Sequence, residues 1–224
     1  MTRFIVSVAL TAALLLSGCI VQDEVTTISV RPDGSATLVV FHSNVRSTEE
    51  GSKAAEELRQ FVESFDARSS DDFVRIRQSG GEAIDGQWLQ REVPYSNLIS
   101  ARLPNAAALE KLCSIEGKDD ELRLTTRYTA DGTRRKLTMV ALPPRDFKLP
   151  DNSVRSSAEI QQDRANGFSE TRLVVVGGEI VASNGWTVAS DKHSAILSLD
   201  EIARLLRNSP NRIELFIEWQ VLGK

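Results

Sequence analysis

The chain has 224 residues, of which 41% are hydrophobic and 26% are charged, and its formal net charge is −4. This composition is that of an ordinary globular protein, long enough for one large domain or two small ones with genuine cores. A mildly acidic chain lacks the positive surface by which proteins bind nucleic acid or anionic lipid, so we expect neither kind of binding.

An apolar stretch from Phe4 to Leu16 follows the positive charge of Arg3. It is shorter than the about 20 apolar residues that span a membrane and is typical of an export signal. It ends in Leu16-Ser17-Gly18-Cys19, which resembles the lipobox of bacterial lipoproteins. The resemblance implies that the chain is cut between Gly18 and Cys19, that the Cys19 thiol carries a diacylglyceryl group, and that the new amine can be acylated too.

Two alternatives to lipidation stay open, an uncleaved anchor helix and an ordinary secretory signal. The first is disfavoured because Asp23 and Glu24 end the apolar region early, and the second would need no cysteine. Two or three acyl chains hold a protein durably, at about 0.8 kcal/mol for each buried methylene. Cleavage would remove 18 of the 224 residues and leave 206, with 26 basic and 31 acidic residues and a net charge of −5.

Residues 19–24 are predicted to form a lipidated tether, and 25–224 the folded domain. Two β-branched runs, Thr26–Val30 and Ala36–Phe41, flank a turn in which Pro32 fixes φ and Gly34 supplies a positive φ. This pattern predicts a hairpin.

A helix is predicted from Ser47 to Asp66. Ser47 and Glu50 fit a capping box, and apolar residues then recur on one helical face. They are Ala54, Ala55, Leu58, Phe61, Val62 and Phe65. The opposite face is too acidic for a helix that lies on a membrane, so the apolar face is interpreted as core.

The middle of the chain is predicted to hold strands at 72–77 and 87–93 on either side of Gly80-Gly81, and a helix at about 105–115. Cys113 lies on the apolar stripe of that helix and is expected to be a buried, inert thiol without an intramolecular disulfide partner. Strands at 122–128 and 135–142 flank Asp131-Gly132, a strong hairpin signal.

Residues 143–169 are polar and contain three prolines, which is long for a plain loop. A short helix is predicted at 157–166. Either the folded part divides into two domains near 143–168, or this segment crosses over one continuous sheet.

The last third is again rich in strands, at 171–176, 179–182, 186–189, 195–199 and 213–221. The first two flank a two-residue turn at Gly177-Gly178, and Ser198 with Glu201 is predicted to begin a short helix that stops before Pro210. Hairpins joined by isolated helices predict an α+β fold, with a mainly antiparallel sheet and two or three packed helices.

Residues with catalytic or metal-binding potential are few. His42 and His193 are the two histidines, and the sequence has no HExxH, CxxC or GxSxG motif. His42 is interpreted as a strand-end imidazole and His193 as a solvated turn residue. We therefore expect no catalytic residues, no cofactor and no metal.

Two segments resemble LppM-like bacterial lipoprotein domains. They are Thr27–Thr37, which contains the Asp33-Gly34 turn close behind the lipobox, and Val176–Trp186, which contains Gly177-Gly178 and Asn184-Gly185. The resemblance implies an α+β envelope domain of no known enzyme activity, with lipid contact as one option. This chain departs from members that carry a C-terminal membrane helix, and no functional residues are carried over.

The leading hypothesis is a non-enzymatic lipoprotein of the bacterial cell envelope, anchored by its N-terminal lipid and binding a protein, a lipid or a glycan. Because Ile20 rather than an aspartate follows Cys19, the outer membrane is expected if two membranes exist. One alternative is an envelope hydrolase with acids among Asp71, Asp72, Asp119 and Asp120. Another is a structural assembly lipoprotein.

Overall fold

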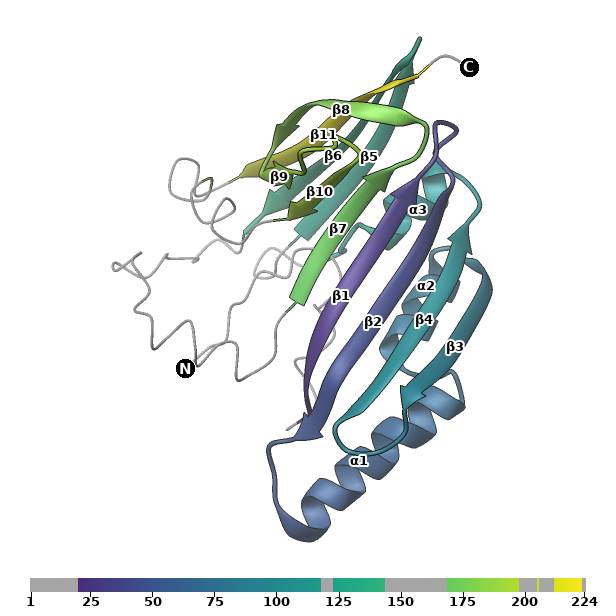
Figure 1. Ribbon diagram of the computed structural model, residues 1–224, viewed down its shortest axis with the longest axis vertical. Coiled ribbons are helices and arrows are strands. Elements are labelled where there is room, and N and C mark those ends of the chain that lie inside the picture. Colours follow the sequence, from purple (N-terminus) through teal and green to yellow (C-terminus); the bar gives the residue numbers. More distant parts are fainter. Residues whose placement is uncertain (1–19, 118–122, 144–168, 198–204, 206–211, 223–224) are drawn as a thin grey trace.

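The computed structural model describes residues 20–117, 123–143, 169–197, 205 and 212–222 (Figure 1). Its strands are β1 (Ile20–Val30), β2 (Ala36–Ser47), β3 (Glu82–Gln90), β4 (Tyr95–Leu103), β5 (Arg123–Asp131), β6 (Arg134–Leu142), β7 (Ser169–Val175), β8 (Gly178–Asn184), β9 (Trp186–Val188), β10 (Ser194–Leu197) and β11 (Ile213–Val221). Its helices are α1 (Gly51–Asp66), α2 (Asp71–Gln78) and α3 (Ala106–Leu112).

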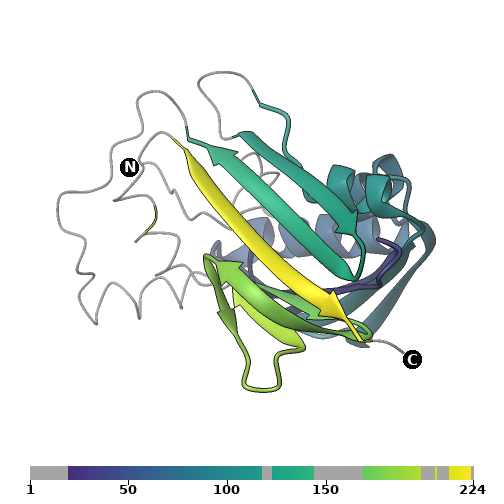
Figure 2. The same cartoon turned by 90° about the horizontal axis from the view of Figure 1, so that it is seen from above.

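The strands form two sheets. The larger has seven strands in the order β3-β4-β2-β1-β7-β10-β9, and the smaller has four in the order β5-β6-β11-β8, seen from above in Figure 2. Within the described residues, β1 and β7 run parallel and the other paired strands run antiparallel. The predicted α+β class with a mainly antiparallel sheet is confirmed.

The first hairpin forms as predicted, but β1 is longer than expected. Ile20 already pairs with Ser47, so residues 20–24 are part of the sheet, and the prediction of a tether there is wrong. Alternate residues of β1 are buried from Val30 back to Glu24, and a register shift between Val21 and Asp23 lets Val21 be buried as well.

The turn of this hairpin contacts the rest of the protein. Gly34 has φ +82°, and a Cβ at this position would lie 2.7 Å from Cβ of Ala106. The Tyr128 hydroxyl and the Arg135 guanidinium both donate to the carbonyl of Pro32, at 2.7 and 2.6 Å. The turn of the β1–β2 hairpin therefore connects the larger sheet to the smaller sheet and to α3.

Residues 72–77 were predicted as a strand, and this prediction is wrong because they lie in α2. Asp71 and Asp72 occupy the first turn, where acidic side chains favour the helix dipole. Phe73 and Ile76 are buried three residues apart on one helical face. This spacing of three is the helical signal.

The two strands after α2 also differ from prediction. β3 spans Glu82–Gln90 rather than 87–93, and β4 (Tyr95–Leu103) was not predicted at all. β4 alternates buried Asn97, Ile99, Ala101 and Leu103 with polar or half-buried residues. The cis peptide bond between Val93 and Pro94 lies in the loop that joins them.

Helix α1 is confirmed, but its capping box does not form. The helix starts at Gly51 with Glu50 as N-cap and no side-chain capping bond. Ser47 instead donates to Glu57 at 2.6 Å and accepts from the Glu49 amide at 3.0 Å. Phe65 is the buried residue of this helix, and Leu58, Phe61 and Val62 are only half-buried.

The predicted helix near 105–115 is confirmed as α3, and its N-cap Asn105 accepts from the Ala108 amide at 3.0 Å. The β5–β6 hairpin pairs from Asp131↔Arg134 to Arg123↔Leu142, as predicted. β11 is the predicted alternating strand, and its buried residues include Leu215, Ile217 and Trp219.

The turn at Gly177-Gly178 joins the two sheets. β7 pairs with β1 and β10, whereas β8 pairs with β11, so the strands flanking this turn do not form a hairpin. A Cβ on Gly178 would lie 2.7 Å from Cδ1 of Trp219, so this corner depends on close backbone approach. β9 and β10, both predicted as strands, pair with each other.

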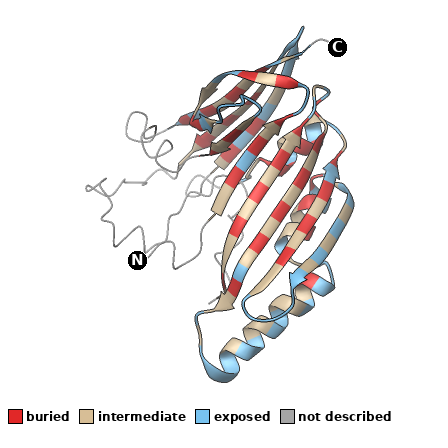
Figure 3. Cartoon of the chain, viewed as in Figure 1, coloured by how far each residue is buried: buried red, intermediate tan, exposed pale blue. Residues whose placement is uncertain are grey.

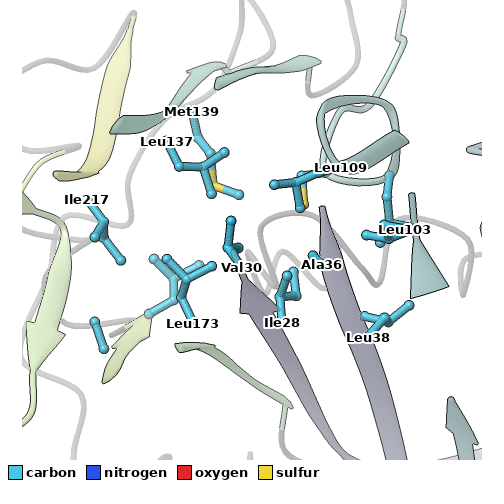
Figure 4. Close-up of a cluster of buried hydrophobic side chains, with 14 of the residues drawn as sticks. Ile28, Val30, Ala36, Leu38, Leu103, Leu109, Leu137, Met139, Leu173 and Ile217 are labelled. Carbon is cyan, nitrogen blue, oxygen red and sulfur yellow. The ribbon is translucent and has the colours of Figure 1, made fainter. Parts of the chain in front are cut away.

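Both sheets contribute to one hydrophobic core, which appears as red bands along the strands in Figure 3. In Figure 4, Val30 and Leu173 of the larger sheet lie near Leu109 of α3 and near Leu137 and Ile217 of the smaller sheet. Strands from both sides of residues 143–168 pair with each other in both sheets, β1 with β7 and β6 with β11. The described strands therefore form one interleaved unit rather than two separate ones.

Two predicted helices fall outside the described residues. The helix at 157–166 lies there entirely. Of the helix predicted to follow Ser198, the structure describes Leu205 alone, as a half-buried residue that packs against the core.

Candidate functional site

A buried polar cluster joins the larger sheet to the start of α2. Glu24 on β1 and His42 on β2 each retain 4% side-chain exposure. Nε2 of His42 lies 3.7 Å from a carboxylate oxygen of Glu24 and 3.4 Å from one of Asp72. Nδ1 lies 3.0 Å from Oδ1 of Asn97 on β4. The imidazole therefore contacts three elements besides its own.

Strand register explains why these residues meet. Glu24 is directly opposite His42, His42 is opposite Asn97, and Asn97 is opposite Trp88. All face the helix-covered side of the sheet because side chains alternate along a strand. Thr26, two residues after Glu24 on this face, donates to its carboxylate at 3.1 Å.

The cluster favours a protonated histidine. Burial alone would lower the pKa of His42, but the nearby carboxylates of Glu24 and Asp72 outweigh it, so this pKa lies above its ordinary value. Burial also raises the pKa of Asp72, against the opposing charges of His42 and Arg75. The arrangement is an imidazolium between two carboxyl groups.

This geometry fits an ion-pair cluster better than a catalytic site. His42 and Glu24 are almost closed to solvent, and Asp72, with 20% side-chain exposure, is the member through which water can approach. The sequence-based interpretation of His42 as a strand-end residue is wrong in one respect, because β2 continues to Ser47 and places the ring in the interior. His193 is exposed as expected, and its Nδ1 lies 2.7 Å from the Gly178 carbonyl oxygen.

The four acids proposed for a hydrolase are not seen to converge. Asp72 joins the His42 cluster, whereas its neighbour Asp71 is exposed. Asp119 and Asp120 lie outside the described residues. In the described part of the chain, no group of three histidine, cysteine, aspartate or glutamate side chains is placed to hold a metal ion.

Cys113 is fully buried and free, as predicted. Burial raises the pKa of its thiol to about 12, so the reactive thiolate is absent at neutral pH. The charge of Arg75, whose guanidinium donates to the Leu112 carbonyl at 2.7 Å, opposes this rise of the pKa but does not cancel it. The thiol therefore behaves as a small apolar side chain.

A second feature is an aromatic cluster at the end of the sheet where β1 begins. Trp88 lies 4.5 Å from Phe65, 6.1 Å from Phe61 and 5.8 Å from Tyr95, measured between ring centroids. Its indole nitrogen donates to Asp66 at 2.7 Å. The cluster fastens α1 to β3 and β4.

Arg91, in the loop after β3, lies over the Trp88 ring at 5.6 Å and forms an ion pair with Asp66. Two residues of the same region project outward, since Leu89 is 53% and Val93 is 55% exposed. Three exposed polar residues, Gln90, Arg91 and Glu92, separate them in the sequence. Neither Leu89 nor Val93 was singled out from the sequence.

Among the described helices, none is both long and apolar enough to cross a membrane. Cys19 lies just outside the described residues, directly before Ile20.

Comparison with known proteins identifies no family for this chain, but it does find a similar solved structure. No protein-family profile and no curated protein matches the sequence. Among solved structures, the chain is similar to the NMR structure of the folded domain of LppM from Mycobacterium tuberculosis, with a TM-score of 0.43 and 8% identity over 94% of this chain and 95% of that one. At this TM-score and identity, the similarity supports no transfer of site or function.

Proposed function

We propose that this chain is a non-enzymatic, lipid-anchored lipoprotein of the bacterial cell envelope, whose domain binds an envelope protein, lipid or glycan. The acyl chains on Cys19 hold the domain to the membrane, and a location at the outer membrane follows if the cell has two membranes, because Ile20 rather than aspartate follows the cysteine.

One observation carries the proposal. The first residue of the sheet, Ile20, directly follows the cysteine of the lipobox-like sequence. Cleavage between Gly18 and Cys19 would therefore remove the apolar segment without removing any residue of the described fold. It would also leave the modified cysteine directly before the first residue of β1.

The non-enzymatic part of the proposal is supported by the character of the polar cluster. Hydrolysis by general acid and base needs groups that reach a substrate. His42 and Glu24 lie under α2 with 4% exposure each, and Cys113 is a buried, protonated thiol. These groups are better suited to holding the fold together than to reacting with a ligand.

The anchor is tested by replacing Cys19 with alanine. Wild-type protein is expected to incorporate labelled palmitate and to fractionate with membranes, whereas Cys19→Ala should lose both properties. The matched control is Cys113→Ala, which removes the other cysteine and should keep the label. Persistent labelling and membrane retention in Cys19→Ala would rule the anchor out.

The binding function is tested by releasing the mature protein from membranes in mild detergent and identifying what co-purifies. A lipid or glycan retained through purification supports a small-ligand binder, and a stoichiometric protein supports an assembly role. Hydrolysis of envelope glycan or lipid by the purified protein, lost in Asp72→Asn, would contradict the proposal.

A further inference from the structure

The β3–β4 loop and the start of β1 lie at the same end of the larger sheet. Ile20 pairs with Ser47 at the end of β2, and Val45 of β2 pairs with Tyr95, the first residue of β4. In Figure 1, the start of β1, the end of β2 and the start of β4 lie together at the end of the molecule nearest α1. The attachment point of Cys19 is therefore at this end too.

The distances involved are short. The strands from β1 to β3 follow the order β1-β2-β4-β3, which is three strand spacings of about 4.8 Å, or roughly 14 Å. No tether separates Cys19 from the sheet, since Ile20 is already paired. A lipid on Cys19 would therefore hold the loop close to the bilayer surface.

Two large apolar side chains are exposed at this end of the sheet. Leu89, near the end of β3, and Val93, in the loop, are more than half exposed, while the ring of Trp88 in the same strand is fixed against Phe65 and its indole nitrogen donates to Asp66. The two apolar side chains thus flank three exposed polar residues, Gln90, Arg91 and Glu92. Arg91, with 60% side-chain exposure, has the long aliphatic stem and charged head that favour a membrane interface.

We propose that the end of β3 and the β3–β4 loop, through Leu89 and Val93, rest on the bilayer into which Cys19 is anchored. This inference rests on the proposed function, because it needs the lipid on Cys19. It adds a second, non-covalent contact that sets the orientation of the domain: the start of β1 and the β3–β4 loop face the membrane, and the β7–β8 corner points away.

The experiment compares two labelled positions in the full-length, membrane-extracted lipoprotein. Val93→Cys and Val176→Cys each receive a fluorophore; Cys113 does not compete because it is buried and its thiol has a pKa of about 12. Val176 is a matched control, since it is 41% exposed and its amide donates to the carbonyl of Val30, the last residue of β1. Ten residue steps of about 3.3 Å separate Val30 from Ile20, roughly 33 Å.

Both proteins are reconstituted into phosphatidylcholine vesicles whose acyl chains carry bromine, which quenches nearby fluorophores. The label at Val93 is expected to lose most of its fluorescence relative to unbrominated vesicles, and the label at Val176 is expected to keep it. Replacing Leu89 by aspartate should weaken the quenching at Val93, while the protein still floats with the vesicles.

Three results would overturn the inference. If the protein floats but the Val93 label is quenched no more than the Val176 label, the loop does not touch the bilayer, and the anchor still stands. If the Val93 label is unquenched in brominated vesicles yet shielded from aqueous iodide in native membranes, a protein covers the loop instead. If the wild-type protein does not float at all, the anchor fails and the inference fails with it.

Discussion

His42 shows how a single residue can join several elements of this fold. Its ring touches Glu24, Asp72 and Asn97, which come from β1, α2 and β4. A buried ion pair does not by itself prove a gain in stability, but removing one partner leaves an uncompensated buried charge. His42 is therefore a residue on which the attachment of α2 depends.

The first prediction concerns the pH dependence of stability. The pKa of His42 is raised above its unfolded value of 6.5, so its stabilising contribution is fully present below that pH and is lost as the pH rises through the folded-state pKa. The raised pKa of Asp72 acts in the same direction, because ionising this acid costs more in the fold than in the unfolded chain. The free energy of unfolding, from urea titrations, should fall as the pH is raised from 6 towards 9.

The variant His42→Gln tests the assignment of this effect. It should lower the free energy of unfolding at pH 6 by about 3 to 5 kcal/mol, because it leaves Glu24 and Asp72 without their cation, and it should flatten the slope above pH 6.5. His193→Gln, at the other histidine, should retain the wild-type slope. An unchanged slope in His42→Gln would show that another group titrates.

The polar cluster around His42 can be recognised in the sequence only when the pairing of β1 with β2 is known. His42 continues the inward positions of Leu38 and Val40, and Glu24 continues those of Ile28 and Thr26. The sequence pattern places Glu24 in a tether at 19–24 and Asp72 in a strand at 72–77, so it does not indicate that either residue contacts His42. Cross-strand pairing is set by tertiary packing, which the local pattern does not contain.

At the scale of elements, the sequence was most informative where a turn and an alternating pattern agreed. The hairpins at Asp33-Gly34 and Asp131-Gly132 and the strand β11 were predicted, and they form. α2 is missed by the sequence pattern, because two turns of helix bury only Phe73 and Ile76, and two apolar positions are too few to establish a period.

A second prediction follows from the packing of α1 and α2 against β3. A Cβ on Gly86 would lie 2.5 Å from Cζ of Phe73 and 3.2 Å from Cζ of Phe65. Gly86→Ala should therefore push both helices from the sheet and lower the free energy of unfolding by about 1 to 3 kcal/mol. Gln87→Ala, at the exposed neighbouring position, should change it by less than about 0.5 kcal/mol. Equal urea midpoints for the two variants would show that the helices are not seated here.

At the scale of the molecule, the pairing of β1 with β7 and of β6 with β11 weaves the two halves of the sequence together. The sequence left a split near 143–168 open, because the length and polarity of a segment do not reveal which strands it connects. Only the strand partners show that the described halves share one core.

A third prediction is that this unit unfolds in one step. Leu173 is fully buried on β7 and stands opposite Ile28, so Leu173→Ala should cost about 2 to 5 kcal/mol. Trp88 lies before the 143–168 segment and Trp219 after it. Single-tryptophan variants reporting from each position should show coincident urea transitions that shift together. Separate midpoints would show two independent units.

The central claim concerns the whole mature molecule: the mature chain begins at Cys19, and this residue carries the lipid. The most direct measurement is the intact mass of wild-type protein extracted from membranes. A chain that begins at Cys19 and carries the added mass of a diacylglyceryl group, with or without a further acyl chain, is the predicted result. A chain that retains residues 1–18, or one with an unmodified Cys19, would contradict the account.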